Sequence, residues 1–218
     1  MTTVLSIEDI GAGWFITGTD TGVGKTHVAC HLLEQLQARG VAAAGFKPVA
    51  SGATPDAGGR LVNTDALALQ ARSARPRDYA AHNPYCFAPA IAPHLAAGQA
   101  GVSIERARIR DGYCALAAGH DCVVVEGAGG WLTPIGPDAS LADVAADLGL
   151  PVLLTVGLRL GCLNHALLTA RAIEARNLCL AGWVGNTLDP EMPALAGNLE
   201  TLRRLLPAPC LGVLPWRA

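Results

Sequence analysis

The stretch Gly18-Thr-Asp-Thr-Gly-Val-Gly-Lys-Thr26 decides how this 218-residue chain folds. The apolar run Trp14-Phe-Ile16 precedes it, and His27-Val-Ala-Cys-His-Leu-Leu33, which has a helical pattern, follows it. A strand, a glycine-rich turn and a helix in this order are typical of a phosphate-binding loop, whose backbone N–H groups point at phosphate oxygens. In such a loop Lys25 reaches the β- and γ-phosphates, and Thr26 offers its hydroxyl to Mg²⁺. The sequence therefore predicts a nucleotide site.

The glycine spacing departs slightly from the usual phosphate-binding loop. The usual pattern requires glycine at position 19, but Thr19 stands there and Gly18 comes one residue earlier. A bare Gly-Lys-Thr is weak evidence for a nucleotide site. The strand before it and the helix after it make the prediction more specific.

Composition favours a single domain over residues 1–218. Apolar residues make up 51% of the chain and charged residues 16%, which excludes general disorder. The net charge is −2 without a basic run, so we expect neither nucleic acid nor a membrane surface as a partner. No apolar stretch reaches membrane-spanning length, and no basic secretory lead is seen. The seven cysteines are scattered without a Cys-x-x-Cys pair, which argues against a zinc or iron–sulfur framework and favours a reducing cytoplasm.

Short apolar runs alternate with helical patterns along the chain. The runs are rich in Val and Leu, as is typical of strands buried on both faces. Strands are predicted at residues 13–18, 42–46, 121–126, 151–156, 179–184 and 210–214. Helices are predicted at residues 25–39, 64–71, 103–118, 140–148, 163–176 and 193–206. This order predicts an α/β fold, a doubly wound and mainly parallel sheet with helices on both faces and ligands at the carboxyl ends of the strands.

Two further segments have no regular pattern. Residues 52–59 are rich in Gly and Pro and follow a strand end, so we expect a mobile loop there. Residues 79–100 contain three prolines and read as irregular.

A second predicted strand ends in an acid. Asp121-Cys-Val-Val-Val-Glu126 is followed by Gly127-Ala-Gly-Gly130, where glycines let the backbone pass close to a ligand. A carboxylate at a strand end beside a phosphate-binding loop is where Mg²⁺ is held in many ATPases. The alternative is that Glu126 is a solvated strand terminus. The neighbouring loop favours the metal role.

A third predicted strand ends before Lys47. The chain has two lysines, Lys25 and Lys47, against fourteen arginines, so a lysine placed only for solubility would be unusual here. Its place at the ligand-binding edge favours a functional Lys47 over a surface one. In the next segment, Asp65 is equally compatible with capping a helix and with binding metal.

Six segments, in the same order and over nearly the whole chain, closely resemble the ATP-dependent dethiobiotin synthetases. They are Thr17-Gly-Thr-Asp-Thr-Gly-Val-Gly-Lys-Thr26, Phe46-Lys-Pro-Val-Ala-Ser-Gly52, Thr64-Asp-Ala-Leu-Ala-Leu69, Val125-Glu-Gly-Ala-Gly-Gly-Trp131, Leu160-Gly-Cys-Leu-Asn-His-Ala166 and Ala181-Gly-Trp-Val-Gly-Asn186. The second and fourth are much more specific than the phosphate-binding loop.

The resemblance implies a reaction. Dethiobiotin synthetases use MgATP and CO₂ to close the ureido ring on 7,8-diaminononanoate. One amine takes up CO₂ as a carbamate, and the carbamate oxygen attacks the γ-phosphate. The second amine then displaces phosphate from the carbamic–phosphoric anhydride. Positive charge from Lys25, Lys47 and Mg²⁺ suits the meeting of two anions.

The resemblance also implies roles for individual residues. It makes Lys47, Lys25 and Thr21 catalytic, and it makes Ser51 a contact for the diamine. The implied magnesium ligands are Thr26, Asp65 and Glu126. The implied nucleotide contacts are Gly22, Val23, Gly24, Lys25, Thr26, His27, Asp65, Glu126, Gly127, Ala128, Gly129, Asn186, Thr187, Leu214, Pro215 and Trp216, of which Asn186 and the last three resemble adenine-recognition elements.

The family works as a homodimer that binds the diamine's carboxylate tail near the subunit interface. By resemblance, Asn164 joins Lys47 and Ser51 as a substrate residue, because a helix N-terminus there suits a carboxylate. The alternative is a simple polar residue in the first turn. Two positions depart from the family: Gly22, where relatives can carry Glu, and Arg159, where they can carry Lys.

Rival classes with the same fold fit less well. Regulatory ATPases of chromosome partition place a signature lysine four residues before Lys25, where this chain has Thr21. Nitrogenase-type iron proteins need paired cysteines. Corrinoid-modifying amidotransferases carry an additional glutaminase domain. A non-catalytic nucleotide-binding module is the alternative in which the two lysines have no catalytic role.

Overall fold

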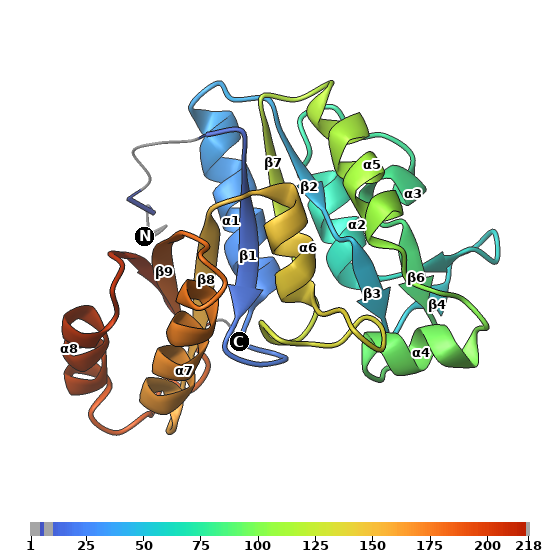
Figure 1. The fold of residues 1–218 in the computed structure, drawn as a ribbon. Coiled ribbons are helices and arrows are strands. Elements are labelled where there is room, and N and C mark those ends of the chain that lie inside the picture. Colours follow the sequence, from blue (N-terminus) through green and yellow to red (C-terminus); the bar gives the residue numbers. More distant parts are fainter. Residues whose placement is uncertain (1–4, 7–10, 217–218) are drawn as a thin grey trace.

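A six-stranded parallel sheet forms the centre of the molecule (Figure 1). The computed structural model describes residues 5–6 and 11–216. The strands are β1 (Gly13–Gly18), β2 (Ala43–Phe46), β7 (Cys122–Glu126), β8 (Val152–Leu158), β9 (Leu180–Thr187) and β10 (Cys210–Leu214). Their order is β10-β9-β8-β1-β7-β2, and each neighbouring pair is parallel. The predicted parallel sheet is confirmed.

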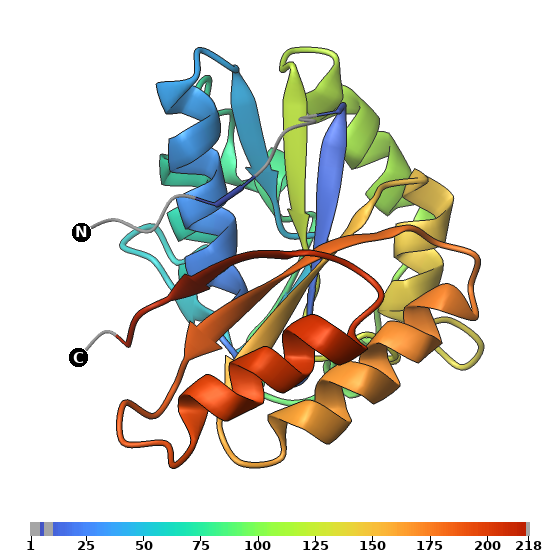
Figure 2. The same cartoon turned by 90° about the vertical axis from the view of Figure 1, so that its left-hand side faces the viewer.

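Both faces of the sheet are covered by helices (Figures 1 and 2). Successive side chains of a strand point to opposite faces. In β1, Trp14 and Ile16 pack with α1 (Lys25–Ala38) and α2 (Thr64–Ala71), whereas Phe15 packs on the other side. That other side carries α5 (Arg106–Ala117), α6 (Leu141–Leu148), α7 (Cys162–Glu174) and α8 (Leu195–Leu205). The sheet is therefore doubly wound, as predicted.

The predicted boundaries agree closely with the observed ones. Each of the six predicted strands and six predicted helices exists at its place. The largest strand difference is in β9, which runs three residues beyond 184, because its pairing with β8 continues to the pair Leu158–Thr187. Within the described residues, no helix has the length and apolarity needed to cross a membrane.

The segment between β2 and α5 was predicted less well. It contains β3 (Val49–Ser51), β6 (Tyr85–Phe87), α3 (Tyr79–His82) and α4 (Pro93–Gln99), and β3 pairs with β6. The expectation that residues 79–100 are irregular is therefore wrong. β4 (Thr54–Pro55) and β5 (Leu61–Val62) form a small antiparallel hairpin in the glycine-rich segment, so residues 52–59 have partly regular structure. The mobility of this segment stays a prediction.

Candidate active site

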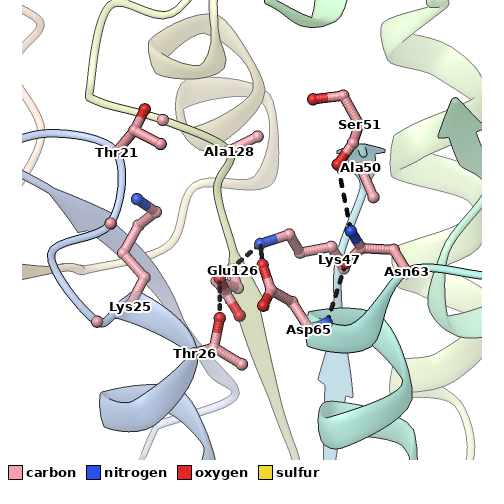
Figure 3. Close-up of a pocket in the computed structure, with 13 residues that line it drawn as sticks. Thr21, Lys25, Thr26, Lys47, Ala50, Ser51, Asn63, Asp65, Glu126 and Ala128 are labelled. Carbon is pink, nitrogen blue, oxygen red and sulfur yellow. Dashed lines mark hydrogen bonds and ion pairs between the residues drawn. The ribbon is translucent and has the colours of Figure 1, made fainter. Parts of the chain in front are cut away.

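A cavity of about 380 Å³ lies between the turn after β1 and the segments that follow β2 and β5 (Figure 3). Parallel strands end at one edge, so loops far apart in sequence meet there. The predicted residues that line this cavity are Thr21, Gly22, Gly24, Lys25, Thr26, Lys47, Ser51, Asp65, Glu126, Ala128 and Gly129. The structure therefore gathers the predicted catalytic and magnesium-binding residues in one place.

Lys47 brings a buried positive charge into the cavity, since only 4% of its surface is exposed. Its Nζ lies 2.5 Å from Glu126 Oε1 and 2.9 Å from Asp65 Oδ2. Burial opposes the charge of Lys47, but the two carboxylates outweigh it and raise its pKa. Lys47 is thus a charged ammonium inside the cavity and not a surface lysine.

Glu126 is the innermost carboxylate, with 1% of its surface exposed. Its Oε1 accepts hydrogen bonds from Lys47 Nζ and, at 2.8 Å, from Thr26 Oγ1. Its Oε2 is buried and has no hydrogen-bond partner among the described residues. A buried carboxylate oxygen normally has a partner, so this atom fits a ligand from outside the chain. The alternative of a solvated strand terminus is wrong.

Asp65 lies in the first turn of α2, but it does not cap the helix. The cap is Asn63, whose Oδ1 accepts from the N–H groups of Asp65 and Ala66 at 3.1 and 3.3 Å. Burial works against the Asp65 carboxylate, but Lys47 outweighs that and lowers its pKa. The capping alternative for Asp65 is wrong, and its carboxylate is left for the cavity.

The oxygen atoms of Thr26, Asp65 and Glu126 are of the kind that Mg²⁺ prefers. The unpartnered Glu126 Oε2 agrees with such a cation. Among the described residues, no group of three or more His, Cys, Asp or Glu side chains is arranged to hold a metal ion. A cation here would therefore have two carboxylates and a hydroxyl from this chain, and it would need oxygens from a ligand or water to complete its shell.

The phosphate-binding loop forms the wall of the cavity that faces Lys47 and Asp65. Gly24 precedes α1 with φ of 88° and, as a glycine, offers no side chain to cap the helix, and the start of a helix directs N–H groups toward a bound anion. Lys25 Nζ donates to the carbonyl of Asp20 at 3.0 Å. Burial and, next, the Lys47 charge lower the pKa of Lys25 to about 8, against the opposing effect of the nearby acids. Phosphate oxygens at this place would restore the full charge of Lys25.

A second pocket of about 420 Å³ opens beside the first, on the far side of Thr26. Four predicted nucleotide contacts line it, namely His27, Asn186, Thr187 and Trp216, of which Asn186 and Trp216 were predicted to recognise adenine. Asn186 also holds the phosphate-binding loop, because its Nδ2 donates to the Val23 carbonyl at 3.0 Å. Its Oδ1 lies 3.2 Å from His27 Nδ1. A side-chain amide retains capacity for further hydrogen bonds, so Asn186 can join the loop to a bound base.

Five predicted residues lie outside both cavity linings. Val23 and Leu214 are buried, and Leu214 packs in the core beside α1. Gly127 donates its N–H to the carbonyl of Ile16. Pro215 and Asn164 are exposed, and Asn164 lies in the first turn of α7. Arg159 forms an exposed ion pair with Asp20 at 2.6 Å.

Sequence reasoning missed other lining residues. Asn63 and Ala50 line the main cavity, and Cys30, Ala68, Arg72 and Leu188 line the second. Asn63 precedes the Thr64-Asp65 pair at a helix start, so its preference for the N-cap position was a signal that could have found it.

The fold and the site together define a P-loop nucleoside triphosphatase. The family described as an AAA domain matches residues 12–218. A ParA family ATPase from Chlorobium tepidum has a similar structure, with a TM-score of 0.59 and 12% identity over 96% of this chain and 86% of that one. The signal recognition particle 54 kDa protein from Aeropyrum pernix gives a TM-score of 0.54 and 19% identity, over 98% of this chain and 43% of that one. At these identities, the likeness concerns the fold alone.

Curated relatives narrow the class to one family. The ATP-dependent dethiobiotin synthetase BioD of Aromatoleum aromaticum is 52% identical over 93% of this chain and 89% of its own length. The Pseudomonas aeruginosa (strain UCBPP-PA14) enzyme of that name is 51% identical over 93% and 89%, and Escherichia coli K12 BioD 1 is 48% identical over 94% and 91%. The chain belongs to the ATP-dependent dethiobiotin synthetases and is a ligase of biotin biosynthesis.

Proposed function

We propose that the single domain of residues 1–218 closes the ureido ring of dethiobiotin from 7,8-diaminononanoate, CO₂ and MgATP. The observation that carries this proposal is the buried Lys47 ammonium, which faces the cavity opposite a phosphate-binding loop. A hydrolytic P-loop enzyme has only water to bring to the γ-phosphate. A second cation at the place of attack suits an anionic nucleophile, and a carbamate is one.

The first step is uptake of CO₂ by one amine of the substrate. CO₂ adds only to a neutral amine, and the pKa of a free alkyl amine is about 10, like that of lysine. Lys25 and Lys47 lie in the same cavity, and nearby cations disfavour a third one. Bound diamine therefore loses a proton more easily than free diamine, and the amine nitrogen forms the N–C bond of a carbamate.

The second step joins the carbamate oxygen to the γ-phosphorus, and the bond to ADP breaks. Phosphoryl transfer is mostly positioning and electrostatic stabilisation. Lys25 and the N–H groups at the start of α1 bind the phosphate oxygens. Lys47 moves between its carboxylates and the two reacting anions, which it neutralises. Mg²⁺ held by Thr26, Asp65 and Glu126 would supply further positive charge to the β- and γ-phosphates.

The third step closes the ring. The second amine attacks the carbonyl carbon of the carbamic–phosphoric anhydride, phosphate leaves, and the nitrogen loses its proton. Ser51 and Thr21 line the cavity on opposite sides and support positioning of the diamine and the leaving phosphate. Holding both amines close to one carbon makes this step effectively unimolecular.

We also infer a homodimer that works in the cytoplasm. Leu160 is 93% exposed and Leu168 is 58% exposed, and both flank Asn164 at the start of α7. Exposed apolar side chains grouped in this way favour a covered surface. A partner subunit over this surface would enclose the carboxylate tail of the diamine beside Asn164.

The test is phosphate release from MgATP with and without 7,8-diaminononanoate and bicarbonate. We expect release to require both, and Lys47→Met to lower it by at least about 100-fold, as loss of one charge-stabilising group does elsewhere. Arg203→Ala, at an exposed position of α8, is the control and is expected to behave as wild type. Phosphate release that is indifferent to the diamine would contradict the proposal and favour a regulatory ATPase.

A further inference from the structure

Three residues of the cavity come from separate segments. Lys47 follows β2, Ser51 ends β3, and Asp65 lies in the first turn of α2. The segments that carry them are short or irregular, and such segments do not hold side chains within a fraction of an ångström by themselves. Their relative placement therefore needs a separate physical cause.

A buried chain of hydrogen bonds runs behind these three residues. Asn63 Oδ1 accepts from the Asp65 N–H, and its Nδ2 donates to the Ser51 carbonyl at 3.2 Å. The Asn63 N–H donates to Tyr79 Oη at 2.8 Å, and Tyr79 donates its hydroxyl hydrogen to Asn83 Oδ1 at 2.7 Å.

The same chain of bonds ends at Lys47. Asn83 Nδ2 donates to the Lys47 carbonyl at 2.6 Å and to the Tyr85 carbonyl at 3.0 Å. One connected path thus joins the backbone of all three cavity residues, through Asn63, Tyr79 and Asn83, which we name the Asn–Tyr–Asn relay.

The relay is well protected from water. Asn63 is 7% exposed, and Tyr79 and Asn83 are each 3% exposed. Burial raises the pKa of the Tyr79 hydroxyl above its ordinary value, so that the hydroxyl keeps the hydrogen it donates to Asn83. Buried polar networks with their partners satisfied rigidify the structure around them, whereas one lost member leaves the others unpaired at a cost.

The geometry points to the Asn–Tyr–Asn relay as the device that sets the distance between the magnesium side and the diamine side of the cavity, with Asn63 at the branch. Asn63 lines the cavity, and its two side-chain atoms serve the two sides separately. The Oδ1 atom fixes the start of α2 and with it Asp65. The Nδ2 atom fixes the end of β3 and with it Ser51. This inference rests on the proposed function for its diamine side.

Two substitutions at Asn63 separate these contacts. Asn63→Ser keeps an oxygen that caps α2 but has no donor that reaches the Ser51 carbonyl, whereas Asn63→Ala removes both contacts. We expect Asn63→Ser to raise the KM for diamine about 10-fold while MgADP binding, measured by calorimetry, stays within about twofold of wild type. We expect Asn63→Ala to weaken both about 10-fold, the size seen when residues that support a metal ligand are changed.

Tyr79→Phe tests the relay at a residue that does not line the cavity. It removes only the hydroxyl between Asn63 and Asn83, and we expect an effect on both MgADP binding and diamine KM in the direction of Asn63→Ala. Ser140→Ala is the matched control, because Ser140 caps α6 at a place outside both cavity linings. It is expected to lower Tm by a similar amount and to leave both ligand measurements unchanged.

The outcomes distinguish the relay from the proposed function. One outcome is that every Asn63 and Tyr79 variant has a lower Tm, as Ser140→Ala does, but keeps MgADP binding and diamine KM within about twofold of wild type. The relay is then structural support only, and the inference fails. If wild type shows no diamine-dependent phosphate release, the proposed function fails instead. The inference is then decided by MgADP binding, which must still fall in Asn63→Ala and Tyr79→Phe and not in Asn63→Ser.

Discussion

The two walls of the main cavity hold their ligands by different means. The phosphate-binding loop offers backbone N–H groups and one lysine, and its shape depends on glycines with φ of 73° and 88° at positions 22 and 24. The opposite wall offers the side chains of Lys47, Asp65 and Glu126, held by partners buried behind them. A backbone site needs permitted dihedral angles, whereas a side-chain site needs a satisfied network. The two walls should therefore fail in different ways when they are mutated.

The two lysines give the largest expected contrast. Lys47 pairs with a carboxylate that is 1% exposed, and removing one partner of a buried pair leaves the other charge without compensation. We expect Lys47→Met to lower the free energy of unfolding by about 3 kcal/mol. Lys25 bears a charge that burial already disfavours, and its Nζ donates to the backbone carbonyl of Asp20. We therefore expect Lys25→Met to change stability by less than about 1 kcal/mol.

Urea unfolding of the ligand-free protein at pH 7 measures both variants. Lysine and methionine have similar volumes, so each substitution removes mainly the charge and the hydrogen bonds. Equal losses in the two variants would mean that the two walls do not differ in this way. A loss restricted to Lys25→Met would reverse the comparison.

The two glycines test the backbone wall. A Cβ on Gly24 would lie 2.1 Å from Asn186 Nδ2, the atom that holds the Val23 carbonyl, and its φ of 88° disfavours any other residue. We expect Gly24→Ala to weaken ATP binding by about 2 kcal/mol, or about 30-fold, because the loop must change shape. Gly22 has a φ of 73°, but a Cβ there meets nothing within 4 Å. Gly22→Ala is the matched control, with backbone strain alone and about 1 kcal/mol expected.

Calorimetric titration with MgATP compares the two glycine variants directly. Asn186→Ala in the Gly24→Ala background adds a second check, because it removes the clashing amide. Asn186 itself holds the loop and lines the second pocket, so the reference is Asn186→Ala alone, and Gly24→Ala is expected to weaken binding less in that background than in wild type. Equal losses at Gly22 and Gly24 would instead assign the whole effect to backbone strain.

The difference between the walls also explains what the sequence could predict. β1, the phosphate-binding loop and α1 follow one another directly, so neighbouring residues carry the whole pattern. The sequence therefore predicts both the structure of residues 13–38 and a nucleotide site there. Glu126 and Lys47 were found because parallel strands bring their carboxyl ends to one edge. The six long strands and six helices have enough residues to express a pattern, and their order fixed the fold class.

The opposite wall was harder to predict because its structure is not local. The strands β3 and β6 have three residues each, too few to show a period, and they pair across more than thirty positions of sequence. In the sequence Asp65 is compatible with two roles because Asn63, Thr64 and Asp65 all favour the N-cap position, and the contacts show that Asn63 takes it. Tyr79 and Asn83 belong to no recognisable sequence motif. Their importance follows from their hydrogen bonds to Asn63 and to the Lys47 carbonyl, which only the three-dimensional structure shows.

The smallest expected effect concerns whether a divalent cation binds the wall of Lys47, Asp65 and Glu126 before or after the nucleotide. The Lys47 ammonium lies against Glu126 Oε1 and Asp65 Oδ2, which belong to the predicted magnesium ligands. A divalent cation that binds there alone must displace Lys47 or approach its positive charge, whereas nucleotide phosphates offer Lys47 a new partner. We therefore expect wild type to bind Mn²⁺, used in place of Mg²⁺, weakly until ATP is added.

Electron paramagnetic resonance of free Mn²⁺ measures this binding without any turnover. We expect Lys47→Met to bind Mn²⁺ without nucleotide about 10-fold more tightly than wild type, equivalent to about 1.4 kcal/mol, because two carboxylates then lack their ammonium. Lys25→Met is the control on the backbone wall and is expected to change nucleotide-free Mn²⁺ binding less, since Lys25 contacts a carbonyl and neither carboxylate. If wild type binds Mn²⁺ alone as tightly as Lys47→Met does, Lys47 does not compete with the cation, and the carboxylates of this wall hold both charges at once.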